Sequence, residues 1–329
     1  GGRGRGMVAR KLLVALLSLS LVCGTLSASA ACDATLPADW VHTALGLPWS
    51  GSTSLWSFVR VFRKQKMVLC TVPGAGSTLL RTFINAIAVS LSGGEINMNQ
   101  TTPHAEMREA WWLTPLETMT RKQVQEIACD PSWTKLAFVR NPYARLLSKF
   151  EDKIVRHGKD MKPGGEAYKE FRIPAERADG LNFTHFTARL AGVAGLTPDV
   201  LDGHSHHIRH RQPVMNKPHS ESEYVDEHFR VMSNFCGMRY IPYEWIRYED
   251  LAPGMNRIAS QMGVSQHPDV AQQIAKFRPR STCDEALRLG RSYSEVDKTR
   301  VREYFAEDFK RFGYSDAFPT CDEPPHPRQ

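Results

Sequence analysis

A glycine-rich turn between an apolar run and a helical pattern has the composition of an anion site. The turn follows the run MVLC at residues 67–70 and opens the pattern STLLRTFINAIAVSL at residues 77–91. Backbone N–H groups at the start of a helix, together with the helix dipole, attract phosphate and similar anions. We therefore predict that the turn binds an anion, although such a turn can also be only a tight connection. Its residues are Pro73, Gly74, Ala75, Gly76, Ser77 and Thr78.

Arg140 and Ser148 form a second candidate for anion binding. Arg140 follows the apolar run at residues 135–139, and Ser148 lies two turns along the helical pattern that comes next. A guanidinium can hold a phosphate through two parallel hydrogen bonds, and a serine hydroxyl can donate another. Alone, the arginine could form a structural salt bridge and the serine could be plain helix surface. From its place on that helix, Ser148 could reach the same anion as Arg140.

Strand patterns that alternate with helical patterns must position these side chains. Strands are predicted at residues 66–72, 135–139 and 244–251. This alternation predicts an α/β fold with a central parallel sheet and helices on both faces. Ligands of such sheets bind beyond the carboxyl ends of the strands, where both candidate stretches lie. Helices are predicted at residues 77–91, 143–157, 253–264, 269–277 and 294–314, with Ser77 and Thr78 at the first N-cap and Ser294 at the last.

The N-terminal segment has the order of a secretory signal. Basic residues after Met7, the expected start, precede an apolar run at residues 12–22 and an A-x-A site that ends at Ala30. The run is short for a membrane span, which needs about 20 apolar residues. We expect a cleaved signal peptide or a retained signal anchor. The sequons at Asn99 and Asn182 would be usable glycosylation sites in that pathway.

The remaining chain is predicted to form one large domain with short flanks. After the signal segment at residues 1–31, we expect a loosely structured lead-in at 32–65 and the main domain at 66–315. Within this domain, residues 158–220 have little periodicity and are interpreted as loops with short helices, notably at 182–192, that select the acceptor. Residues 316–329 are expected to be a disordered tail.

Seven cysteines and a histidine-rich stretch raise the question of a metal site. Cys23 lies in the signal, and the other six favour disulfide bonds in an oxidising compartment, with their pairing left open. There is no C-x-x-C spacing, and the stretch HSHHIRH at residues 204–210 has no supporting cysteine or carboxylate pattern. We expect no metal and interpret this stretch as a solvated basic loop that could touch an acidic glycan. The six cysteines are Cys32, Cys70, Cys129, Cys236, Cys283 and Cys321.

The stretches VPGAGSTLLR and FVRNPYARLLSKF resemble the two nucleotide-binding motifs of the Golgi carbohydrate sulfotransferases, the group that contains the chondroitin and dermatan 4-O-sulfotransferases. In that family the first motif, roughly V-P-K-x-x-C/S-S/T-x-x-K/R, holds the 5′-phosphosulfate of 3′-phosphoadenosine-5′-phosphosulfate (PAPS). The second, F-V/L-R-D/E-P-x-x-R-L-V/L-S, holds the 3′-phosphate. The resemblance covers about residues 66–315 and implies a P-loop-like three-layer α/β fold. It also implies sulfuryl transfer from PAPS to a carbohydrate hydroxyl in the Golgi lumen.

The resemblance also implies the role of individual residues. It places the 5′-phosphosulfate on the turn and on Arg81, and the 3′-phosphate on Arg140 and Ser148. Gly74 stands where the family has a lysine, whose charge stabilises the bridging oxygen as its bond to sulfur breaks. Arg81 is the candidate substitute, and Gly74→Lys is expected to raise turnover if nothing substitutes. The alternative is a catalytically weak member that binds PAPS or a glycan.

Sulfuryl transfer also needs a base for the acceptor hydroxyl, and a histidine suits this role near neutral pH. Among 12 histidines, His228 is the first candidate because its DEHF stretch resembles the HW position of the family. His104, between the two motifs, is the second candidate.

Two other classes of function are disfavoured by the sequence. A P-loop kinase or NTPase would carry G-x-x-x-x-G-K-S/T, which is absent. The net charge of +7 suits an anionic ligand, an acidic polymer or a membrane surface. A nucleic-acid partner conflicts with the signal segment, and no basic helix with interleaved aromatics stands out. The expected partner is therefore a glycan acceptor, with membrane contact only through the N-terminal segment.

Overall fold

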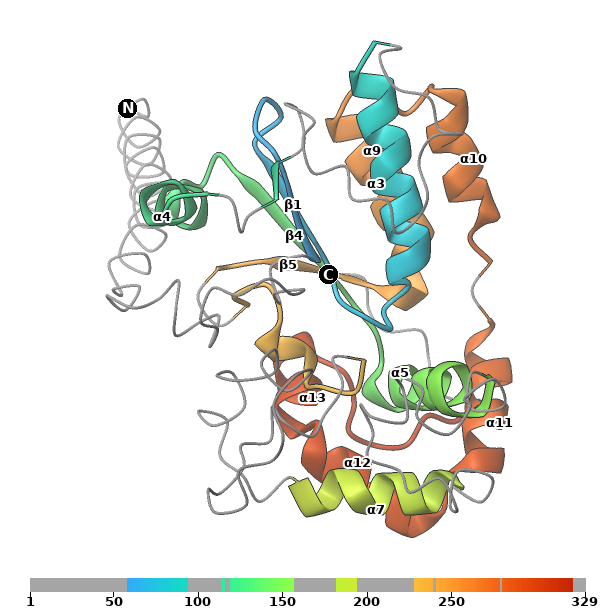
Figure 1. Cartoon of the computed structure of the whole chain (residues 1–329). Coiled ribbons are helices and arrows are strands. Elements are labelled where there is room, and N and C mark those ends of the chain that lie inside the picture. Colours follow the sequence, from blue (N-terminus) through green and yellow to red (C-terminus); the bar gives the residue numbers. More distant parts are fainter. Residues whose placement is uncertain are drawn as a thin grey trace, which may run out of the picture.

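The computed structural model describes the central part of the chain in several stretches (Figure 1). The signal segment, Asn99, His104 and the histidine-rich stretch lie outside the described residues. No helix within the described stretches is long and apolar enough to span a bilayer. The described residues are 58–93, 114–115, 119–156, 182–193, 228–238, 241–278 and 280–321.

A twisted sheet with a parallel centre forms the middle layer, as predicted. Its strand order is β3-β1-β2-β4-β5. β2 pairs in parallel with β4, and β4 pairs in parallel with β5. β1 runs antiparallel to both β2 and β3. The strands are β1 (Val59–Phe62), β2 (Met67–Thr71), β3 (Thr114–Pro115), β4 (Thr134–Val139) and β5 (Glu244–Arg247).

Apolar helices cover both faces of the sheet because its central strands are buried on both sides. Alternate residues of β2 enter different cores: Val68 and Cys70 join one apolar cluster, whereas Met67 and Leu69 join the other. Continuous apolar runs such as those of β2 and β4 are typical of parallel strands covered on both faces. The predicted three-layer α/β fold is therefore confirmed.

The helices fall into two groups: Figure 1 shows one at the upper right of the sheet, and the other below the sheet and, for one helix, to its left. The group that packs with Met67 and Leu69 contains α3 (Ser77–Leu91), α9 (Leu251–Gln261) and α10 (Pro268–Lys276). The opposite group packs with Val68 and Cys70. It comprises α4 (Arg121–Cys129), α5 (Pro142–Lys149), η4 (Phe150–Arg156), α7 (Phe183–Val193), α11 (Thr282–Ser292), α12 (Glu295–Tyr304) and α13 (Ala306–Phe312).

Three expectations about the elements are corrected. The lead-in expected to be loose contains β1, because its apolar residues Val59 and Val61 are buried beside β2. The single helix expected at 294–314 breaks at Phe305, whose backbone leaves helical geometry (φ −102°, ψ 21°) while its ring is buried in the core. The first N-cap is Gly76 rather than Ser77 or Thr78. Ser294 does cap α12, as predicted.

Disulfide bonds tie distant elements to this frame. Cys70 of β2 is bonded to Cys236, and Cys283 of α11 is bonded to Cys321. Cys129 is also disulfide-bonded. The second bond holds part of the segment expected to be a disordered tail, so that expectation is corrected for residues 316–321. Within them, the ring of Phe318 packs against Tyr143 and Tyr293, with centroids 5.2 and 5.4 Å apart.

A buried carboxylate in α13 makes the stability of the fold depend on pH. Asp308 is fully buried and accepts hydrogen bonds from the backbone N–H groups of Met232 and Ser233 at 2.7 and 2.9 Å. Burial raises the pKa of Asp308 to about 6, against the lowering effect of these hydrogen bonds and of Arg145. The folded state therefore keeps a proton that the unfolded chain releases near its ordinary value of 3.8.

We expect the free energy of unfolding to fall as the pH rises through this interval. For Asp308 alone, the fall is about 2 kcal/mol between about pH 4.5 and pH 6.5. Urea unfolding of the disulfide-intact protein at both pH values measures it, with Asp308→Asn as the variant that lacks the titrating group. The pH dependence should be smaller in Asp308→Asn than in the wild type. An equal change of unfolding free energy with pH in the two proteins would show that Asp308 has the same pKa in the folded and unfolded states.

Candidate active site

The glycine-rich turn leaves the end of β2 and leads directly into α3. Gly74 and Gly76 have φ values of +87° and +81°, a region that glycine adopts without the steric cost of a side chain. No side chain caps the N-terminus of α3. The N–H groups of its first turn are therefore not satisfied by a side-chain cap, and they can meet an anion as the sequence predicts.

Arg140 connects the second motif to this turn. Its Nη1 donates a 3.4 Å hydrogen bond to the carbonyl oxygen of Gly74, and its guanidinium lies over the ring of Tyr248, 4.5 Å from the centroid. The residue is 8% exposed. Its Nε is buried and has no hydrogen-bond partner within the described part of the chain. A buried donor of this kind, attached to a guanidinium beside the turn, fits an anionic ligand.

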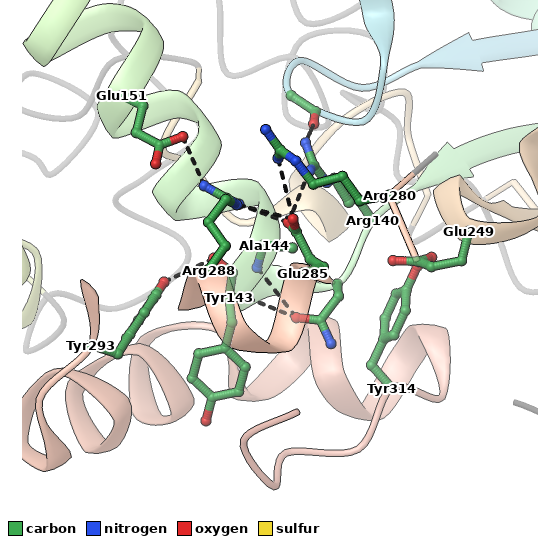
Figure 2. Close-up of polar contacts among 12 residues, drawn as sticks. Arg140, Tyr143, Ala144, Glu151, Glu249, Arg280, Glu285, Arg288, Tyr293 and Tyr314 are labelled. Carbon is green, nitrogen blue, oxygen red and sulfur yellow. Dashed lines mark hydrogen bonds and ion pairs between the residues drawn. The ribbon is translucent and has the colours of Figure 1, made fainter. Parts of the chain in front are cut away.

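A carboxylate pairs with Arg140 and with two further arginines (Figure 2). Glu285 of α11 pairs with Arg140 at 3.2 Å, with Arg280 at 3.2 Å and with Arg288 at 2.7 Å. Arg288 also reaches Glu151 of η4, at 2.7 Å. Burial alone would raise the pKa of Glu285, but the hydrogen bond and charge of Arg288, with the charges of Arg140 and Arg280, lower it. The carboxylate thus stays ionised among an excess of positive charge.

Arg145 fixes the turn against the segment that carries His228. Its side chain is almost fully buried, with 1% exposed. Nε donates to the carbonyl oxygen of Pro73 at 2.8 Å, and Nη1 donates to that of Arg230 at 2.7 Å. One guanidinium therefore bridges the turn and the chain two residues after His228. Of the predicted base candidates, His228 is half-buried in the segment that contains Arg230, whereas His104 lies outside the described residues.

The other predicted site residues lie on the two helices that follow the motifs. Arg81 is half-buried on α3, and its guanidinium lies over the ring of Phe58, 5.3 Å from the centroid. Ser148 is half-buried on α5. Thr78 is exposed and Ser77 half-buried at the start of α3. The structure thus brings Arg140 to the turn, while a shared ligand for Ser148 or Arg81 stays a prediction.

The surroundings of Gly74 disfavour the lysine that the family motif has there. A Cβ atom placed on Gly74 would lie 3.0 Å from Cγ of Arg145 and 3.1 Å from Cγ of Lys149. These side chains would have to shift by a few tenths of an ångström, and hydrogen bonds to two carbonyl groups hold Arg145 in place. The positive φ adds backbone strain for any L-residue. The expectation that Gly74→Lys raises turnover stays a prediction, and these contacts count against it because the substitution would first displace these side chains.

Several residues of this site were not identified from the sequence. Arg145 is the second of the two arginines in the second motif, so its position in that motif was an available signal. Glu285 and Arg280 lie far along the chain from the turn, and no spacing pattern links them to it. No cluster of three or more His, Cys, Asp or Glu residues that could hold a metal ion occurs among the described residues.

Most of the chain is similar to known sulfotransferases. The model of the family described as "Sulfotransferase family" matches residues 58–315, a range that contains the complete arrangement above. Carbohydrate sulfotransferase 10 of Xenopus laevis is 26% identical over 286 residues, covering 80% of this chain and 70% of that protein. Carbohydrate sulfotransferase 10 of Danio rerio is 20% identical over 268 residues, covering 76% and 64%.

Human carbohydrate sulfotransferase 8 is 22% identical over 269 residues, covering 78% of this chain and 55% of that protein. The chain therefore spans less than two thirds of the length of some of these relatives. No solved structure matches it significantly.

Proposed function

Because the chain belongs to the sulfotransferase family, we propose that it transfers a sulfuryl group from PAPS to a hydroxyl group of a carbohydrate. The observation that carries this proposal is the junction of the two motifs. Arg140, with a buried Nε donor that lacks a described partner, reaches the glycine-rich turn at the start of α3. Such a junction can hold two phosphate groups of one nucleotide. The names of the relatives, carbohydrate sulfotransferases 8 and 10, support the acceptor class.

The residues of the site divide the work of the reaction. N–H groups at the start of α3 bind the 5′-phosphosulfate, and Arg140 with Ser148 binds the 3′-phosphate. His228 takes the proton of the acceptor hydroxyl as its oxygen attacks sulfur. Glu285 holds Arg140 in place and can share it with the ligand, because Arg280 and Arg288 continue to neutralise the carboxylate.

We further propose that the protein acts in the secretory pathway, in the Golgi lumen. The signal-like N-terminus supports this location, and so do the disulfide bonds, which persist in oxidising compartments. The second candidate function is binding of PAPS or a glycan without efficient transfer. It is considered because Gly74 replaces the lysine of the family motif. The family membership favours the enzyme.

Titration with adenosine 3′,5′-bisphosphate, the product formed from PAPS, tests the nucleotide site. Arg140→Ala is expected to weaken binding about ten- to hundredfold, because a charge-assisted contact to the 3′-phosphate is lost. Isothermal titration calorimetry of the full chain measures this change. Arg257→Ala is the matched control, since Arg257 forms a surface ion pair with Glu244. Its affinity should stay that of the wild type. Equal affinities for wild type and Arg140→Ala would place the nucleotide elsewhere.

A further inference from the structure

The space beside Gly74 is occupied by side chains of α5. The Cγ atoms of Arg145 and Lys149 lie 3.0 and 3.1 Å from the point where the Cβ atom of a side chain at position 74 would be. The two residues are four positions apart on α5, so their side chains face the glycine-rich turn from the same side of the helix. The loop that has lost its own lysine is therefore lined by a lysine and an arginine from a different element.

The two cations differ in what they already bind. Arg145 uses Nε and Nη1 for the carbonyl groups of Pro73 and Arg230, so it has a structural task. The ammonium of Lys149 pairs with Asp152 at 3.3 Å, the one ion pair that it forms within the described stretches. A lysine ammonium has three donors on a flexible four-carbon stem, so it can turn toward a ligand while Arg145 stays fixed.

Lys149 is also poorly solvated for a lysine. Its side chain is 16% exposed. Burial lowers the pKa of Lys149, and the neighbouring Lys153 and Arg145 lower it further, whereas the charge and hydrogen bond of Asp152 oppose the shift. A partly desolvated ammonium interacts more strongly with a nearby anion than a solvated one, because the local dielectric response is weaker.

We propose that Lys149 supplies the cation that Gly74 cannot, and that its ammonium contacts the bridging oxygen and 5′-phosphate of PAPS during transfer. This inference rests on the proposed function. The acceptor oxygen forms a bond to sulfur while the bond between sulfur and the bridging oxygen breaks. The electron pair of the broken bond stays on that oxygen, which becomes part of the 5′-phosphate of adenosine 3′,5′-bisphosphate. The acceptor proton passes to the base, and Lys149 keeps its own proton.

Lys149 thereby replaces Arg81 as our candidate for the catalytic cation. Arg81 stacks on Phe58, at the chain segment that leads into β1. Lys149 instead lies against the turn itself, next to Gly74, which stands where the family motif has a lysine. The site would thus keep a positive charge, but the charge would come from a residue of α5 and not from position 74.

The test compares two nucleotides on the full chain. Lys149→Met keeps the length and apolar character of the stem but removes the charge. It should lower the turnover number about 10²–10³-fold. It should also weaken binding of adenosine 3′,5′-bisphosphate about tenfold or more. Binding of adenosine 3′-monophosphate, which has no 5′-phosphate, should stay within about twofold of the wild type.

Two further variants make the result specific to this position. Lys149→Arg keeps the charge and should retain turnover to within about tenfold of the wild type. Lys153→Met removes the same charge further along the chain and should leave both affinities and the turnover number nearly unchanged. A folded Lys149→Met with wild-type turnover would overturn the inference and leave the proposed function intact. Equal losses for both nucleotides, or equal losses in Lys153→Met, would overturn it as well. A wild type that neither binds PAPS nor transfers sulfate would overturn the proposed function together with this inference.

Discussion

Replacement of His228 with alanine is expected to lower the turnover number about 10²–10⁴-fold, the range of a positioned general base. Affinity for adenosine 3′,5′-bisphosphate should remain that of the wild type, because none of the proposed nucleotide contacts involves His228. The physical reason for choosing His228 is the bridge formed by Arg145. Its guanidinium bonds the turn at Pro73 and the chain at Arg230, two residues beyond His228.

Steady-state rates with PAPS and an accepting glycan measure this loss. His185→Ala is the matched control, because His185 is an exposed histidine at the start of α7. His104→Ala separates the two candidates. Full activity in His228→Ala together with a large loss in His104→Ala would assign the role of base to His104. Full activity in both would mean that the acceptor proton goes to another group.

Arg145→Met is expected to reduce the free energy of unfolding by about 3–5 kcal/mol, as removal of one partner from a buried charged contact commonly does. The substitution leaves the carbonyl groups of Pro73 and Arg230 without their described side-chain donor in a buried region. It also removes a positive charge that lowers the pKa of the buried Asp308. The turn and the His228 segment should then lose their common anchor, so turnover of the molecules that remain folded should fall as well.

Denaturant unfolding with the disulfides intact measures the stability change. Arg145→Lys should recover part of it, since an ammonium can reach one carbonyl group but lacks the planar fork that spans both. Arg257→Met serves as the surface control and should change stability by no more than about 1 kcal/mol. A similar small change for Arg145→Met would show that the bridge contributes little to the fold.

The main strands and the anion-binding turn were predictable because local patterns determine them. The apolar runs around Leu69 and Leu136 read as buried strands, and in the fold these two residues are direct neighbours in register. Arg140 was identified because its motif places it at the end of a strand, where parallel sheets bind ligands. The same local reasoning found the cap at Ser294, whose hydroxyl accepts a hydrogen bond from the N–H group of Asp297.

The charge network was not predictable, because it depends on contacts between distant parts of the chain. Glu285 meets Arg140 across 145 residues of sequence, and only the packing of α11 against α5 brings them together. The relation between Lys149 and Gly74 is equally invisible in a linear motif, which registers the missing lysine and cannot show what fills its space. The break at Phe305 is likewise not marked in the sequence, because no glycine or proline lies beside it.

The central claim is that this chain transfers a sulfuryl group from PAPS to a carbohydrate. The most direct measurement is incubation of the full chain with radiolabelled PAPS and a panel of desulfated polysaccharides and oligosaccharides. We expect label to appear on at least one carbohydrate as a sulfate ester, with one adenosine 3′,5′-bisphosphate released for each ester formed. Tight binding of PAPS without label on any carbohydrate, while a known carbohydrate sulfotransferase labels the same panel, would contradict the claim.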